Sequence, residues 1–193
     1  MKKKYDYKSA ELYKIFLQTN NFNAIKSFLD IHGGINAVDE SGRTALFECI
    51  VLFNSPDGKF DFANDHAKKL IDLGIDINKV DAKGYVALHQ CILEKNYAIM
   101  DILLETPGIE IHTPQNLLQF ALNRDTTNSS LMIRLIKLGL DPHEKDERGY
   151  SFFDIVKQFD DGTRTIGGNK MDVKAVMDFI TPLARPSTPG NAD

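Results

Sequence analysis

The sequence predicts an all-α fold built from about five repeated helix pairs. The turn pattern Asp-x-x-Gly occurs three times, at residues 39–42, 81–84 and 146–149, and apolar residues at helical spacing follow each copy. Gly74 and Gly139 each follow an apolar helical pattern, where a left-handed glycine can close the last turn of a helix. This recurring order of helix end, turn and helix start is typical of a repeat protein.

The turns divide the chain into units. We interpret residues 1–9 as an N-terminal extension and residues 10–183 as the repeat domain. Its units are expected at about 10–38, 39–80, 81–110, 111–145 and 146–183. Two segments rich in turn residues, 54–62 and 160–169, are predicted to be insertions between the helices of a pair. Residues 184–193 have almost nothing to bury, so we expect a disordered tail.

Composition and charge argue against several classes of protein. Hydrophobic residues make up 42% of the 193 residues and charged residues 26%, which is typical of a globular protein. The formal net charge of −4 argues against a main task of neutralising nucleic-acid phosphate. No stretch approaches the roughly 20 apolar residues of a membrane span, and no apolar run follows the basic residues 2–4 as in a signal peptide. We therefore expect a cytoplasmic protein that binds neither nucleic acid nor membranes.

The two cysteines, Cys49 and Cys91, occupy equivalent positions in adjacent predicted units. Stacked helices lie about 8–10 Å apart, whereas the Cα atoms of a disulfide are normally within about 7 Å. We therefore predict two buried free thiols that pack as small apolar side chains.

No residue pattern indicates catalysis, a metal or a cofactor. The five histidines fall at unrelated positions of the units, and no two have the i, i+4 spacing of a helical zinc site. The carboxylate pairs of the insertions lack the calcium-loop pattern, and no serine has the context of a nucleophile elbow. We therefore expect no enzymatic activity, no metal and no cofactor. A ligand or catalytic site in the 160–169 insertion is the least favoured interpretation.

The units resemble ankyrin repeats. The motifs that carry the resemblance are Asp39-x-x-Gly42-x-Thr44-x-Leu46, Asp81-x-x-Gly84-x-x-x-Leu88-His89 and Asp146-x-x-Gly149-x-Ser151-x-Phe153. The family period is about 33 residues, and the 42 residues from Gly42 to Gly84 equal one period plus the nine-residue insertion. The resemblance implies an ankyrin solenoid of about five helix pairs, joined by short β-hairpin fingers. The fourth unit lacks the Asp-x-x-Gly turn, so its finger is expected to be short.

The sequence departs from the family around the first helix of each pair. The usual threonine is replaced by Val86 in the third unit, so the family's threonine–histidine hydrogen bond cannot form with His89. Phe47 and Asp154 replace the histidine in the second and fifth units. We expect these changes to lower local stability and to leave the architecture intact, because neighbouring repeats stabilise one another.

The resemblance also implies a binding surface, because hairpin tips and first helices line a concave groove in ankyrin proteins. The residues predicted to contact a partner are Glu40, Ser41, Arg43, Lys83, Tyr85, Glu94, Glu147, Arg148 and Tyr150. Tyr85 and Tyr150 occupy the slot directly after the turn glycine, where Arg43 stands in the second unit. Tyrosine and arginine are enriched at binding hot spots, although at this position they can also simply shield the turn.

A second candidate surface is the 54–62 insertion. Its phenylalanines, Phe60 and Phe62, either pack back onto the helices or form an exposed patch for a partner.

The function that the resemblance implies is protein–protein interaction. A short array with no catalytic domain is similar to small bacterial ankyrin proteins, some of which neutralise a toxin or an enzyme by binding it. We therefore expect a monomer that binds and inhibits or sequesters a partner protein. The alternative is an effector or scaffold that recruits a host or cellular protein.

Overall fold

The described part of the computed structural model comprises residues 6–18, 20–52, 62–124, 128–160 and 173–183. Within these ranges the chain forms ten α-helices and one short 3₁₀-helix, and no strand. The predicted all-α class is therefore confirmed. The two predicted insertions, apart from Phe62 and Asp160, and the tail lie outside the described residues. The chain divides into two compact units, residues 1–117 and 118–193. From here on, the first unit and the second unit are these two parts of the chain and not the predicted repeats.

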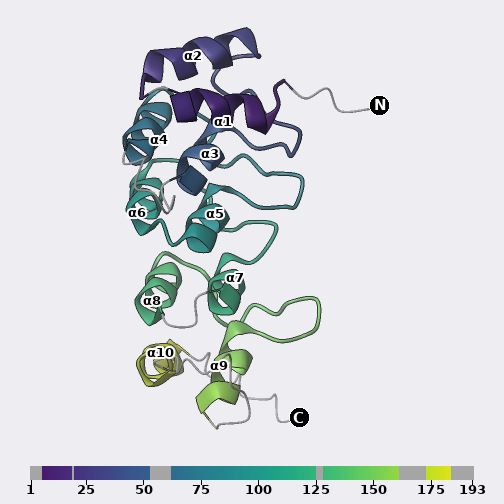
Figure 1. Ribbon diagram of the computed structural model, residues 1–193. Coiled ribbons are helices and arrows are strands. Elements are labelled where there is room, and N and C mark those ends of the chain that lie inside the picture. The colour runs from purple at the N-terminus through teal and green to yellow at the C-terminus, as the bar shows by residue number, and fades with distance from the viewer. Residues whose placement is uncertain (1–5, 19, 53–61, 125–127, 161–172, 184–193) are drawn as a thin grey trace, which may run out of the picture. The chain divides into compact units, whose positions relative to one another are not determined.

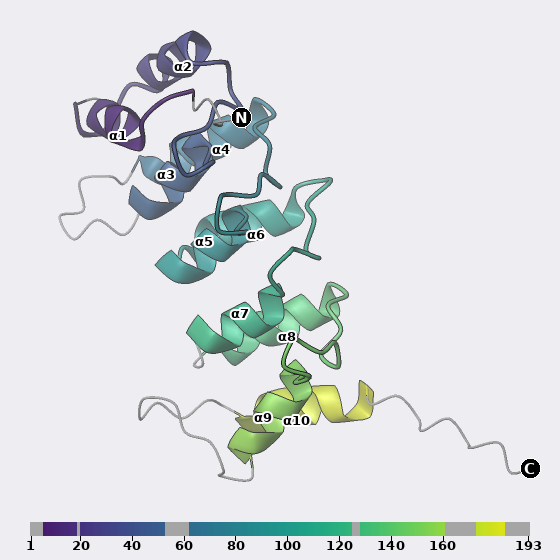
Figure 2. The ribbon, with the colours of Figure 1, turned by 90° about the vertical axis from the view of Figure 1, so that its right-hand side faces the viewer.

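The first unit contains three helix pairs. Their bounds are α1 Ser9–Gln18, α2 Phe22–Ile31, α3 Ala45–Leu52, α4 Ala63–Asp72, α5 Ala87–Glu94 and α6 Tyr97–Glu105. Figure 1 shows α1, α3 and α5 in one row and α2, α4 and α6 in a second row. In the view of Figure 2, α4 lies behind α3, and α6 lies behind α5. α3 packs against α1, α4 and α5, and α6 packs against α4 and α5.

The apolar faces of these helices form the core of the first unit. Leu46 and Ile50 of α3, Leu88 of α5, Leu70 of α4 and Ile99 of α6 have no exposed surface or almost none. Burying each side chain of this size contributes about 1.5–3 kcal/mol before entropy costs. These buried side chains of α3 to α6 therefore hold two helix pairs of the first unit together.

Both cysteines belong to this core. Cys49 and Cys91 are free thiols with no exposed surface, which confirms the prediction made from their spacing. Burial raises the pKa of both thiols well above the ordinary value, so they remain protonated and unreactive.

The three Asp-x-x-Gly turns share one hydrogen-bond pattern. The Oδ1 atom of Asp39, Asp81 and Asp146 accepts the backbone N–H groups of the residues two and four positions later, at 2.8–2.9 Å. The N–H of each aspartate donates to the carbonyl of the residue four positions later, at 2.8–2.9 Å. Gly84 has φ +84°, a conformation that side chains with a Cβ rarely adopt. One aspartate side chain thus holds the whole turn.

The predicted β-hairpin fingers are not seen. Among the described residues the sole β interaction is an isolated bridge between Lys145 and Ser151. Each turn is closed by a backbone hydrogen bond from the N–H of its aspartate to the carbonyl four positions later, and no strand extends from this bond in the described residues. The hairpin part of the fold prediction is therefore not shown by the described residues and stays a prediction.

The second unit has the remaining helices. They are α7 Leu117–Arg124, α8 Ser129–Lys137, α9 Phe152–Asp160, α10 Val173–Ile180 and the 3₁₀-helix η1 Thr181–Leu183. The first residue of α7, Leu117, belongs to the first unit. α10 packs against α8, α9 and η1. The core of the second unit includes the fully buried residues Leu122, Leu135, Val156 and Val176.

No helix in the described ranges has both the length and the apolar character needed to cross a membrane.

Candidate partner-binding surface

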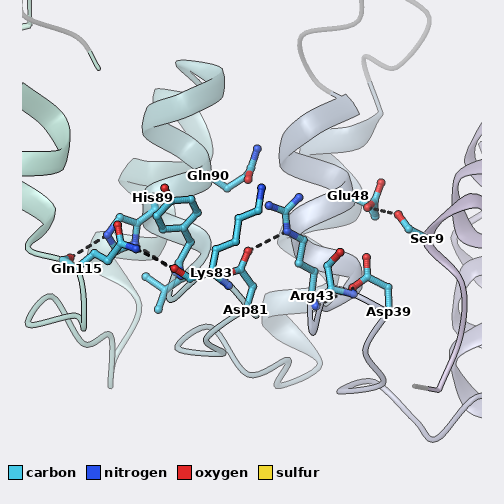
Figure 3. A network of polar contacts seen from close by, with 12 residues as sticks. Ser9, Asp39, Arg43, Glu48, Asp81, Lys83, His89, Gln90 and Gln115 are labelled. Carbon is cyan, nitrogen blue, oxygen red and sulfur yellow. Dashed lines mark hydrogen bonds and ion pairs between the residues drawn. The ribbon is translucent and has the colours of Figure 1, made fainter. Parts of the chain in front are cut away.

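The slot after the turn glycine is occupied by Arg43 in the turn that precedes α3. Its Nε donates to Oδ2 of Asp81 at 3.0 Å, and its guanidinium lies 5.6 Å from the ring centre of Phe47. The side chain of Asp81 is only 1% exposed and that of Arg43 only 21%. Arg43, which the sequence places on the binding surface, therefore links one turn to the next turn of the same unit (Figure 3).

Tyr85 occupies the same slot before α5. Its ring stacks on His89 with centroids 5.3 Å apart and planes inclined by 27°. His89 is fully buried; its Nδ1 accepts the N–H of Val86 at 3.2 Å, and its Nε2 lies 2.9 Å from the carbonyl of Gln115. Nε2 must therefore carry the proton. Burial lowers the pKa of His89, so the ring is neutral and serves as a support for Tyr85.

Tyr150 occupies the slot in the second unit and is the most exposed of the three, at 49%. Its backbone is held by Asp146 and by Gln119 of α7, whose Nε2 donates to the Tyr150 carbonyl at 3.1 Å. Arg148 is exposed on the same turn. Of the aromatic and arginine residues predicted to bind a partner, these two are the most available.

The other predicted residues of the first unit lie on the turns and on α5. Glu40 and Lys83 are exposed, and Glu94 is half-buried and accepts a hydrogen bond from Nε2 of Gln90 at 2.9 Å. Ser41 is exposed, and its carbonyl accepts the N–H of Ala82 at 2.8 Å, which joins the two turns. Glu147 of the second unit is exposed. The structure thus leaves Glu40, Lys83 and Glu147 accessible at the turn tips.

A buried acid, Glu48, was not predicted as part of this surface. It is 8% exposed, and its Oε1 accepts a hydrogen bond from Oγ of Ser9 at 2.6 Å (Figure 3). Burial raises the pKa of Glu48, and the hydrogen bond from Ser9 partly opposes this rise. Its position as the single charged residue of the apolar run Ala45–Leu52 is the signal that could have drawn attention to it.

The chain before α1 contributes to the same region. Tyr7 is 4% exposed, and its hydroxyl donates to the carbonyl of Arg43 at 3.1 Å. The N–H of Ser9 donates to Oε2 of Glu40 at 3.0 Å. Residues that the sequence assigns to an N-terminal extension therefore support the first turn.

The residue before each first helix differs among the three turns. Ser151 and Asp154 form a reciprocal capping box, in which Oγ of Ser151 accepts the N–H of Asp154 at 3.1 Å and Oδ2 of Asp154 accepts the N–H of Ser151 at 3.0 Å. The hydrogen bond from the N–H of Ser151, with a smaller effect of the Ser151 hydroxyl that donates to the same oxygen at 2.9 Å, lowers the pKa of Asp154. Thr44 has the hydroxyl but faces Phe47 at the third helical position, and its fully buried Oγ1 has no hydrogen-bond partner. Of these two positions, only the one before α9 therefore forms a reciprocal cap between a hydroxyl and the side chain three residues later.

The second candidate surface is only partly described. Phe62 is half-buried, with its ring centre 5.0 Å from that of His66 on α4. Phe60 lies outside the described residues. A role of the two phenylalanines in binding stays a prediction.

In the described ranges, no cluster of three or more histidine, cysteine or acidic side chains could hold a metal ion. What the surface can do chemically is form hydrogen bonds, ion pairs and aromatic contacts with another molecule.

No protein-family model matches the chain, and no curated protein sequence matches it.

Proposed function

We propose that this chain is an ankyrin-type module that binds a partner protein and inhibits or sequesters it. The observation that carries the proposal is the common hydrogen-bond pattern of the three Asp-x-x-Gly turns. A tip held by its own aspartate loses little conformational entropy on binding, which favours affinity.

The residues on these tips are of the kind that protein interfaces use. Tyr150 and Arg148 supply an exposed aromatic ring and a guanidinium, the side chains enriched at hot spots. Glu40, Lys83 and Glu147 supply charges of both signs, which favour a partner with complementary charges and suit specific recognition. An ankyrin-type array with about five repeats is consistent with these turns and with the paired helices of each unit.

The proposal is tested by capturing the partner with the purified chain from the cells that make it, followed by measurement of affinity and stoichiometry. We expect a one-to-one complex whose affinity falls at least tenfold when Lys83→Glu and Glu147→Lys are combined. Reversal of the exposed pair Lys26–Asp30 on α2 is the matched control and should change the affinity by less than twofold. Equal effects of the two double variants would contradict binding through the turns.

The activity of the captured partner separates the two forms of the proposal. Loss of the partner's activity in the complex supports inhibition. A partner that remains fully active when bound would make the chain a scaffold or a recruiting effector instead.

A further inference from the structure

The second unit has a polar hollow beside Tyr150, which we name the Tyr150 hollow. Its volume is about 300 Å³, and it is lined by Gln119, Asn123, Asp146, Arg148, Tyr150, Ile155 and Gln158. Ligand pockets start at about this size. The hollow therefore suits a single side chain better than a helix or a large cofactor.

Hydrogen bonds and packing hold the walls of the hollow in place. Gln119 Nε2 donates to the Tyr150 carbonyl at 3.1 Å, which ties the turn to α7. Oδ1 of Asp146 accepts the N–H groups of Arg148 and Tyr150, both at 2.9 Å. Ile155 of α9 is buried and adds an apolar surface to the lining. The backbone that carries the arginine and the tyrosine is thus fixed before any ligand arrives.

The charges of the lining favour an anionic side chain with one charge. Arg148 is the cation among the seven lining residues, and its planar guanidinium matches a carboxylate with two parallel hydrogen bonds. Asp146 is the anion, and its Oδ1 is already bonded to the turn. A phosphate group carries nearly two negative charges. The single guanidinium would neutralise them only in part, and the neighbouring carboxylate of Asp146 would repel them.

We propose that the Tyr150 hollow receives an aspartate or glutamate side chain of the partner protein. Arg148 pairs with the carboxylate, and the Tyr150 ring packs against the stem of the same side chain. This inference rests on the proposed function, because it names the partner's contact chemistry at one part of the turn surface.

The inference is tested by nuclear magnetic resonance titration of the full ¹⁵N-labelled chain with three probes. They are the capped tripeptides acetyl-Gly-Glu-Gly-amide and acetyl-Gly-Gln-Gly-amide, and inorganic phosphate. We expect the glutamate peptide to shift the signals of Arg148 and Tyr150 with millimolar affinity, at least tenfold tighter than the glutamine peptide. Arg148→Gln should abolish these shifts, whereas Lys174→Gln, which removes a positive charge from an exposed position on α10, should leave them unchanged.

Three outcomes would overturn the inference. They are equal shifts from both peptides, tighter binding of phosphate than of the glutamate peptide, and the absence of shifts at Arg148 and Tyr150. The captured partner separates this result from the proposed function. A partner that still binds Arg148→Gln as tightly as Lys174→Gln refutes the carboxylate contact alone, whereas a chain that binds no partner refutes the function.

Discussion

Arg43 and Asp81 join two successive turns through a 3.0 Å ion pair that is nearly closed to solvent. The carboxylate of Asp81 also accepts two backbone N–H groups through its other oxygen, so it holds its own turn and the arginine of the preceding one. The carboxylate of Asp81 therefore couples the two neighbouring turns, in addition to the backbone hydrogen bond from Ala82 to Ser41.

Removal of this arginine should destabilise the protein. We expect Arg43→Ala to lower the free energy of unfolding by about 1–3 kcal/mol, because a buried carboxylate loses its charged partner. Lys83→Ala, on the exposed tip of the next turn, should change it by less than about 0.5 kcal/mol. Urea denaturation of both variants measures the difference, and equal small effects would mean that the ion pair contributes little.

The residue before the first helix allows a paired test in one structural slot. Thr44→Val should leave stability unchanged or raise it by up to about 1 kcal/mol, because the buried hydroxyl has no partner to lose. Ser151→Ala should lower stability by about 1 kcal/mol, because it breaks the capping box with Asp154. Thermal and urea unfolding test both changes. A destabilised Thr44→Val variant would contradict the finding that the Thr44 hydroxyl has no hydrogen-bond partner.

The buried carboxyl group of Glu48 should make the stability of the folded protein depend on pH. Burial raises the pKa of its folded form above the ordinary value of 4.5, so its contribution is fully present below that pH and is lost as the pH rises through the raised pKa. Glu48→Gln keeps an acceptor for Ser9 and removes the buried charge. We expect this variant to be more stable than the wild type at pH 7, with the difference shrinking towards pH 4.

Unfolding in urea at both pH values measures this effect. Glu147→Gln, at an exposed turn tip, is the control and should show no comparable change of the difference with pH. A Glu48→Gln advantage that is the same at pH 4 and pH 7 would contradict the assignment.

The helices could be predicted from apolar periodicity, because burial of one face depends mainly on local spacing. Each of the three Asp-x-x-Gly turns is followed by a helix where the apolar spacing predicts one, namely α3, α5 and α9. The turns could also be predicted, since one aspartate and one glycine suffice to build them.

The roles of the slot residues could not be predicted in the same way. Arg43, Tyr85 and Tyr150 have equivalent positions, yet the first meets Asp81, the second stacks on His89 and the third is half exposed. Each outcome depends on the side chain that packing brings within reach, 38 residues away for Arg43 and four for Tyr85. The bond between Ser9 and Glu48, 39 residues apart, was missed for the same reason.

Gly84 tests the turn geometry itself. Its φ of +84° strains any residue with a Cβ, although the nearest atoms, of Gln115, lie 3.5 Å or more from the position that a Cβ would take. Gly84→Val should therefore cost more than about 1 kcal/mol, whereas Gly84→Asn should cost less, because asparagine tolerates the left-handed region. Equal losses for the two variants, measured by urea unfolding, would point to crowding instead of backbone strain.

Binding through the turn surface is tested most directly by the affinity of the captured partner for Tyr85→Ala combined with Tyr150→Ala. Isothermal titration calorimetry should show a loss of at least about 2 kcal/mol of binding free energy. Tyr150→Ala alone should account for most of this loss, because Tyr150 is the exposed ring and Tyr85 rests on His89. Unchanged affinity in a double variant that retains the circular dichroism spectrum of the wild type would contradict the account.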